Sequence, residues 1–138
     1  MPRKLTLLVA FLSLFSNPAL AEGDNITAAN VNTFYQKCSE NALTMDAIRY
    51  CLMEVSDNYM QSAYAAQSAA ILKTGNIEAL RELEYSQDIF LSYRSAACNF
   101  VSEANSDMGW TSSDITTNCY TNLTRSRAEF LEEKWVLD

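Results

Sequence analysis

The chain has 138 residues, with ten basic and seventeen acidic residues and no histidine, so its formal net charge at pH 7 is −7. Such an acidic surface repels nucleic acids and anionic lipids, and it favours cationic partners. Without histidine, a serine or cysteine nucleophile lacks its most common general base, so the composition also argues against a hydrolase of that kind.

The first 21 residues have the pattern of a secretory signal peptide. A basic start, an apolar run too short for a stable membrane anchor and two small residues before a cleavage site follow one another: Arg3 and Lys4, Leu5–Phe15, and Ala19 with Ala21. We therefore predict cleavage after residue 21 and export to the bacterial periplasm or the exterior. The mature domain, residues 22–138, keeps eight basic and seventeen acidic residues, a net charge of −9, and no apolar stretch long enough for a membrane anchor.

The mature chain has the propensities of a helical protein, since it contains no proline and only three glycines. Apolar residues spaced by three and four predict a short helix over residues 28–38. Thr44 can cap a second helix, whose apolar positions follow the helical period for about seven turns. Gly75 can end this helix in a left-handed conformation. Asn76 can then cap a third helix, predicted from Ile77 to about Ala104.

The remaining segment contains a polar loop and a fourth helix. The loop is predicted over residues 105–114, and Ser112 or Ser113 can serve as the N-cap of the helix that follows. The sequence thus predicts an all-α fold, a small disulfide-stapled bundle. Its two long helices form an antiparallel hairpin, and a shorter helix at each terminus packs against that hairpin.

The four cysteines all lie in the exported part of the chain. An even number of cysteines in an oxidising compartment predicts two disulfides, here among Cys38, Cys51, Cys98 and Cys119. We favour the pairing 38–51 with 98–119, because it would staple both terminal helices to the hairpin. A crossed pairing stays open, since Cys51 and Cys98 fall at the same level of the predicted hairpin.

Arg94 falls on the predicted inner face of the third helix, next to Phe90 and Cys98. A buried arginine needs a carboxylate, because an unpaired charge inside a protein is costly. In a hairpin that turns near residue 75, Asp57 lies within one helical turn of the level of Arg94. We therefore predict a structural ion pair between these two residues, bidentate if the guanidinium plane faces the carboxylate. The alternative is that Arg94 binds a ligand or takes part in catalysis.

The predicted loop is the candidate contact region for a protein partner. It holds Asp107, Met108, Trp110 and Asp114, and tryptophan and methionine are common at protein interfaces. Trp110 could instead cover the core. We predict no catalytic residue, no cofactor and no metal site, since no phosphate-binding loop or zinc-ligand spacing occurs. Paired acids such as Glu132 and Glu133 are interpreted as solvated helix faces.

Four groups of residues, in chain order, resemble the lysozyme inhibitor LprI-like family of exported bacterial proteins. They are Cys38, Thr44, Ile48 and Cys51; Asp57, Met60, Gln61 and Tyr64; Gln87, Phe90, Tyr93, Arg94 and Cys98; and Cys119, Thr124, Arg127 and Leu131. The chain departs from the family pattern at Ser95 and Ala97, where acids are usual, and at Phe90, where tryptophan is usual. The resemblance implies a small helical protein of the periplasm or the exterior, and lysozyme inhibition as in some members.

Two functions follow from these observations. The first is an exported, non-catalytic protein that inhibits a cationic lysozyme through acidic and aromatic surface groups. The second is an interaction or structural module of the cell envelope with another protein partner. Neither function involves nucleic acid, and neither needs a membrane anchor once the signal peptide is removed.

Overall fold

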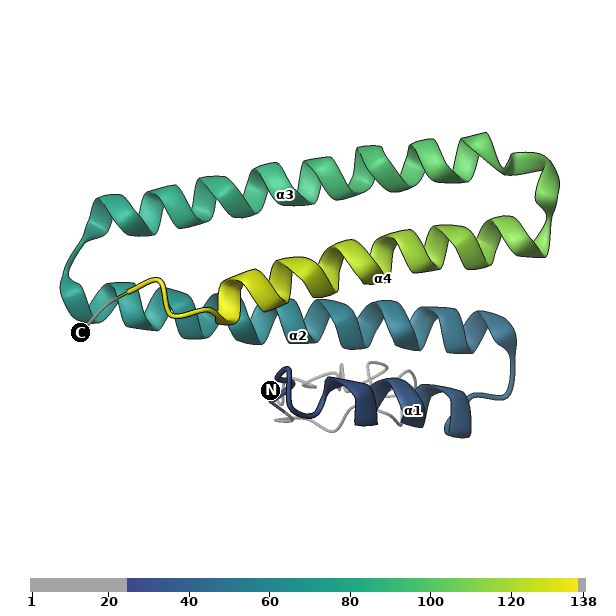
Figure 1. Cartoon of the computed structure of the whole chain (residues 1–138), viewed down its shortest axis with the longest axis horizontal. Coiled ribbons are helices and arrows are strands. Elements are labelled where there is room, and N and C mark those ends of the chain that lie inside the picture. The colour runs from purple at the N-terminus through teal and green to yellow at the C-terminus, as the bar shows by residue number, and fades with distance from the viewer. Residues whose placement is uncertain (1–24, 137–138) are drawn as a thin grey trace, which may run out of the picture.

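The computed structural model describes residues 25–136, which form four α-helices and one short 3₁₀ helix (Figure 1). In chain order these are α1 (Val31–Asn41), α2 (Met45–Thr74), α3 (Ile77–Ala104), η1 (Ser106–Met108) and α4 (Trp110–Glu132). The all-α prediction is therefore confirmed. The predicted signal peptide, residues 1–21, lies outside the described residues. Within the described part, no helix is both long enough and apolar enough to cross a membrane.

The predicted ends of the two long helices are confirmed in detail. The Thr44 hydroxyl accepts a hydrogen bond from the amide of Ala47 at 3.1 Å and so caps α2. Gly75 ends α2 with φ = 71°, a left-handed conformation that glycine adopts without steric cost. The Asn76 side chain accepts from the amide of Ala79 at 3.0 Å and caps α3.

Two helix starts differ from the prediction. Helix α1 begins at Val31, three residues late, because the preceding residues form a turn in which the Asn30 side chain accepts from the amide of Thr27 at 2.8 Å. The N-cap predicted at Ser112 or Ser113 is wrong, since α4 already begins at Trp110. Gly109 precedes it with φ = 57°, and this left-handed residue reverses the chain directly after η1.

The order of the helices in space also departs from a simple hairpin. Helices α2 and α3 are antiparallel and joined at the Gly75 turn, but α4 lies between them (Figure 1). Helix α4 packs on both long helices, and most extensively on α2, whereas α2 and α3 contact each other much less. Helix α1 packs on α2 at the far side of the bundle. The bundle is therefore held together mainly through α4.

The apolar core lies where α1, α2 and α4 meet. Its buried members come from the segment before α1 and from these three helices: Ile26, Val31, Phe34, Cys38, Cys51, Val55, Tyr59, Met60, Ala63, Ala128 and Leu131. Helix α3 borders this core through the partly buried Leu83, Phe90 and Leu91, and its own buried residues are Gln87 and Cys98. Most of the surface of α3 consequently faces solvent.

Two disulfides join neighbouring helices, and they have the favoured sequential pairing. Cys38–Cys51 links α1 to α2, with a Cα–Cα distance of 5.6 Å. Cys98–Cys119 links α3 to α4, with a Cα–Cα distance of 5.7 Å. The crossed pairing is wrong, because α4 separates α3 from α2. Loops of this length stabilise a fold by about 3 kcal/mol each in the chain-entropy view.

Candidate functional site

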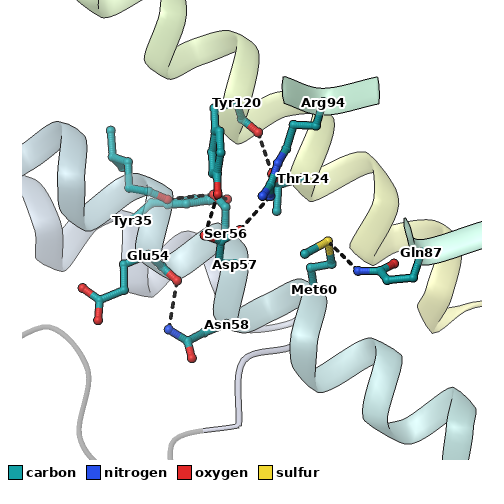
Figure 2. Close-up of polar contacts among 11 residues, drawn as sticks. Tyr35, Glu54, Ser56, Asp57, Asn58, Met60, Gln87, Arg94, Tyr120 and Thr124 are labelled. Atoms are coloured by element: carbon teal, nitrogen blue, oxygen red, sulfur yellow. Dashed lines mark hydrogen bonds and ion pairs between the residues drawn. The ribbon is translucent and has the colours of Figure 1, made fainter. Parts of the chain in front are cut away.

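Arg94 lies at the centre of a polar cluster that connects three helices (Figure 2). Its Nη1 donates to Asp57 Oδ1 at 2.8 Å and to Thr124 Oγ1 at 2.9 Å. The Tyr120 hydroxyl donates to the other Asp57 oxygen at 2.7 Å, and the Tyr120 ring lies 3.9 Å from the guanidinium carbon. We call Asp57, Arg94, Tyr120 and Thr124 the central cluster.

The surroundings of the central cluster suit a structural contact. The Arg94 side chain is 12% exposed and that of Asp57 is 38% exposed, so the guanidinium is the more enclosed of the two charges. Burial and the hydrogen bond to Asp57 raise the pKa of Tyr120 to about 12, and the phenol therefore remains a donor at neutral pH. The predicted contact between Asp57 and Arg94 is present, but it is not bidentate, because Tyr120 occupies the second carboxylate oxygen.

A second polar chain crosses the bundle closer to the Gly75 turn. Arg127 of α4 donates from Nε to Gln87 Oε1 at 3.0 Å and from Nη2 to Ser86 Oγ at 2.6 Å. The Gln87 amide in turn approaches Met60 Sδ at 3.4 Å, as Figure 2 shows. Burial lowers the pKa of Arg127. This chain joins α4, α3 and α2 a second time.

Glu132 is exposed, as the sequence suggested, but its carboxylate also has two defined partners. Its carboxylate accepts a hydrogen bond from the buried Tyr59 hydroxyl at 2.9 Å and from the amide of Ala28 at 3.2 Å. Burial and this bond raise the pKa of Tyr59. The end of α4 is thereby tied to the start of the described chain, a role that its neighbour Glu133 does not share.

The predicted contact residues lie at the end of the bundle opposite the Gly75 turn. Asp107 and Met108 belong to η1 and are exposed, and Trp110 is the first residue of α4, with 73% of its surface exposed. Asp114 lies one turn further along α4. Trp110 therefore faces solvent and does not cover the core. We call Asp107, Met108, Trp110 and Asp114, with Arg49 of α2, the end surface.

Arg49 organises the end surface, and the sequence analysis missed it. Its Nε donates to Asp114 Oδ1 at 2.8 Å and its Nη1 to Asp46 Oδ1 at 2.7 Å. Its guanidinium carbon lies 5.6 Å from the centre of a Trp110 ring. The hydrogen bond to Asp114 raises the pKa of Arg49. Asp46 three residues before Arg49 was a visible signal, but only the tertiary structure adds α4.

A shallow cleft of about 400 Å³ opens beside Arg49. Helices α2, α3 and α4 supply its walls, which are rich in hydroxyl groups: Asp46, Arg49, Tyr50, Met53, Ser102, Ser112, Ser113, Thr116, Thr117 and Tyr120. An exposed tryptophan next to a concave surface resembles the anchors and pockets of protein interfaces. Over residues 25–136 there is no group of three acidic or cysteine side chains that could hold a metal ion.

Comparison with protein families assigns the chain to a family, which the geometry alone does not. The model of the family described as "Lysozyme inhibitor LprI" matches residues 36–131. The chain belongs to this family. No match was found among curated proteins or among solved structures.

The LprI match extends from α1 to the end of α4. It includes both disulfides, the central cluster and the end surface. The family assignment therefore concerns the whole disulfide-stapled bundle, and all the residues proposed below as contacts lie inside the matched range.

Proposed function

We propose that this protein is an exported inhibitor that binds a cationic lysozyme. The observation that carries the proposal is the match to the LprI lysozyme inhibitor family over residues 36–131. The net charge of −7, or −9 after removal of the predicted signal peptide, supports it, because lysozymes of the hen type are strongly basic. Inhibition by binding needs neither a catalytic residue nor a cofactor, which agrees with the family's description as inhibitors.

Export is part of the same proposal. Two disulfides persist in the periplasm or outside the cell, whereas the cytosol keeps thiols reduced. The signal-peptide pattern of residues 1–21 indicates the same compartment. A lysozyme that attacks the cell wall meets its inhibitor only there.

The end surface is our proposed contact region. Trp110 provides a large, exposed aromatic group, and Asp107 and Asp114 bring negative charge beside it. Arg49 holds the Asp114 carboxylate and stacks near the tryptophan ring, so the ring needs little ordering when a partner binds. A basic partner would gain both an apolar anchor and an electrostatic attraction.

The test is lysozyme inhibition at physiological salt. The Debye length is then about 8 Å, so a weak association that is purely electrostatic disappears. We expect the wild type to inhibit a hen-type lysozyme, and Trp110→Ala to weaken inhibition by more than about tenfold. Trp135→Ala is the matched control, since Trp135 is also exposed but stacks on Phe130 away from the end surface. Asp107→Asn should mainly slow association.

Full lysozyme activity in the presence of the wild-type protein at that salt concentration would contradict the proposal. The protein would then be an interaction module of the envelope with another partner. If Trp110→Ala and Trp135→Ala weaken inhibition equally, the protein is still an inhibitor, but the end surface is not its binding site.

A further inference from the structure

The outer face of α3 carries a second set of exposed apolar side chains. Tyr85, Ile89, Tyr93 and Phe100 each expose between 50% and 73% of their surface. Their spacings of four, four and seven residues place them on one side of the helix, in a stripe about 22 Å long. The buried residues Gln87 and Cys98 face the opposite way, toward α4.

Carboxylates continue this stripe at both of its ends. Glu78 and Glu82 precede Tyr85 by seven and three residues, and Glu103 follows Phe100 by three, so all three acids share the face. Each of them is exposed. The exposed cation on this helix, Arg81, already contacts Glu78 at 3.4 Å. We call the seven residues from Glu78 to Glu103 on this face the α3 stripe: Glu78, Glu82, Tyr85, Ile89, Tyr93, Phe100 and Glu103.

An apolar centre with a charged border is the usual composition of a protein-binding surface. Four large apolar groups in a row on one helix face exceed what scattered exposed residues explain. A helix that presents such a row binds by laying it into an apolar groove of a partner.

The charge pattern selects the kind of partner. In a pair of identical chains joined through this face, the acids at each end would meet acids, whether the helices ran parallel or antiparallel, and like charges repel. A cationic partner would instead neutralise both ends. We propose that the α3 stripe is a docking surface for a basic protein of the lysozyme type, a proposal that rests on the function given above and adds a second contact surface to it.

The experiment compares variants by calorimetric affinity for a hen-type lysozyme at physiological salt, with inhibition of the enzyme measured separately. Tyr85→Ser/Tyr93→Ser removes two exposed rings and no charge. We expect it to bind more than about tenfold more weakly than the wild type. Leu72→Ser, an exposed apolar residue of α2 outside the stripe, is the matched control and should bind like the wild type. Phe100→Ser serves as an independent single variant if the double variant does not fold.

The outcomes separate the two proposals. Unchanged affinity in the stripe variants overturns the α3 surface alone and leaves inhibition standing. A lysozyme that is bound through the stripe but keeps full activity removes the proposed inhibition and leaves the docking surface standing. Absence of binding by the wild type overturns both, and equal weakening by Leu72→Ser shows that the effect is not specific to α3.

Discussion

Arg94 and Arg49 have the same kinds of neighbours, but the carboxylates that they bind differ in their exposure to solvent. Each donates to a carboxylate from another helix at 2.8 Å, and each lies against an aromatic ring that belongs to α4. Around Arg94, the Asp57 carboxylate is 38% exposed and the ring is that of a partly buried tyrosine. The Arg49 side chain is as enclosed as that of Arg94, at 10% against 12% exposed, but its carboxylate partners Asp46 and Asp114 are 82% and 52% exposed.

The difference decides what each group can do. A buried ion pair loses much free energy when one partner is removed, because the remaining charge has no access to water. Removing an arginine whose carboxylate partners are exposed costs less, because water solvates the carboxylates that remain. The central cluster thus connects helices, whereas the end surface keeps its carboxylates and its tryptophan available to a partner.

The largest effect is expected when the guanidinium of Arg94 loses its carboxylate partner. Asp57→Ala should lower the free energy of unfolding by about 3–5 kcal/mol, since the side chain left behind is only 12% exposed. Arg94→Met should cost about 1–2 kcal/mol, because the Asp57 carboxylate stays hydrated and keeps its bond from Tyr120. Urea denaturation measures both.

The double variant Asp57→Ala/Arg94→Met provides the control for this contact. Its loss of stability should be smaller than the sum of the two single losses, since no charge is stranded. Additive losses would mean that the two side chains do not interact in solution.

A smaller effect is expected at high pH. Burial and Asp57 raise the pKa of Tyr120 from 10 to about 12, so the folded state keeps a proton that the unfolded state releases first. The contribution of Tyr120 to stability should be constant below pH 10 and fall between pH 10 and 12. In Tyr120→Phe, the free energy of unfolding should fall by about 1 kcal/mol less over this pH range than in the wild type, a value reduced for solvent screening.

The decline itself should persist in part in Tyr120→Phe, because burial and Glu132 also raise the pKa of Tyr59. Urea midpoints measured at several pH values provide the test. If Tyr120→Phe and the wild type decline equally steeply above pH 10, the buried phenol is not responsible.

The smallest effect on stability is expected at Arg49. Arg49→Met retains contact with the Trp110 ring and leaves two carboxylates that water can solvate. Its urea midpoint should therefore stay close to that of the wild type. A shift as large as that of Asp57→Ala would show that the end surface is as integral to the fold as the central cluster.

Local sequence signals predicted the local structure well. Thr44, Gly75 and Asn76 form the caps and the turn that their side chains or backbone freedom favour. These features depend on residues three or four positions apart, so no knowledge of distant segments is required. The contact between Asp57 and Arg94 was also predictable, because a tight turn fixes the relative level of two long helices.

The misses are of two kinds. Two helix starts differ for local reasons, since the turn at Asn30 delays α1 and Gly109, with φ = 57°, lets α4 begin before the serines. The other misses are contacts between distant segments. Arg49 meets Asp114 across 65 residues, and Glu132 meets Tyr59 across 73. Such contacts follow from the position of α4 between α2 and α3, which helical periodicity does not specify.

The sequence by itself determined an all-α chain, the caps at Thr44, Gly75 and Asn76, its cysteine content and its acidic character, because these depend on composition and on short-range spacing. Apolar spacing had already placed the side of α3 with Arg94 and Cys98 on the inner face. Only the tertiary structure decided which helix covers that side. Helix α4, rather than α2, packs most against the side with Gln87 and Cys98, and the row from Tyr85 to Phe100 faces solvent. The packing order of helices depends on contacts between distant segments, and the periodicity of one helix does not specify it.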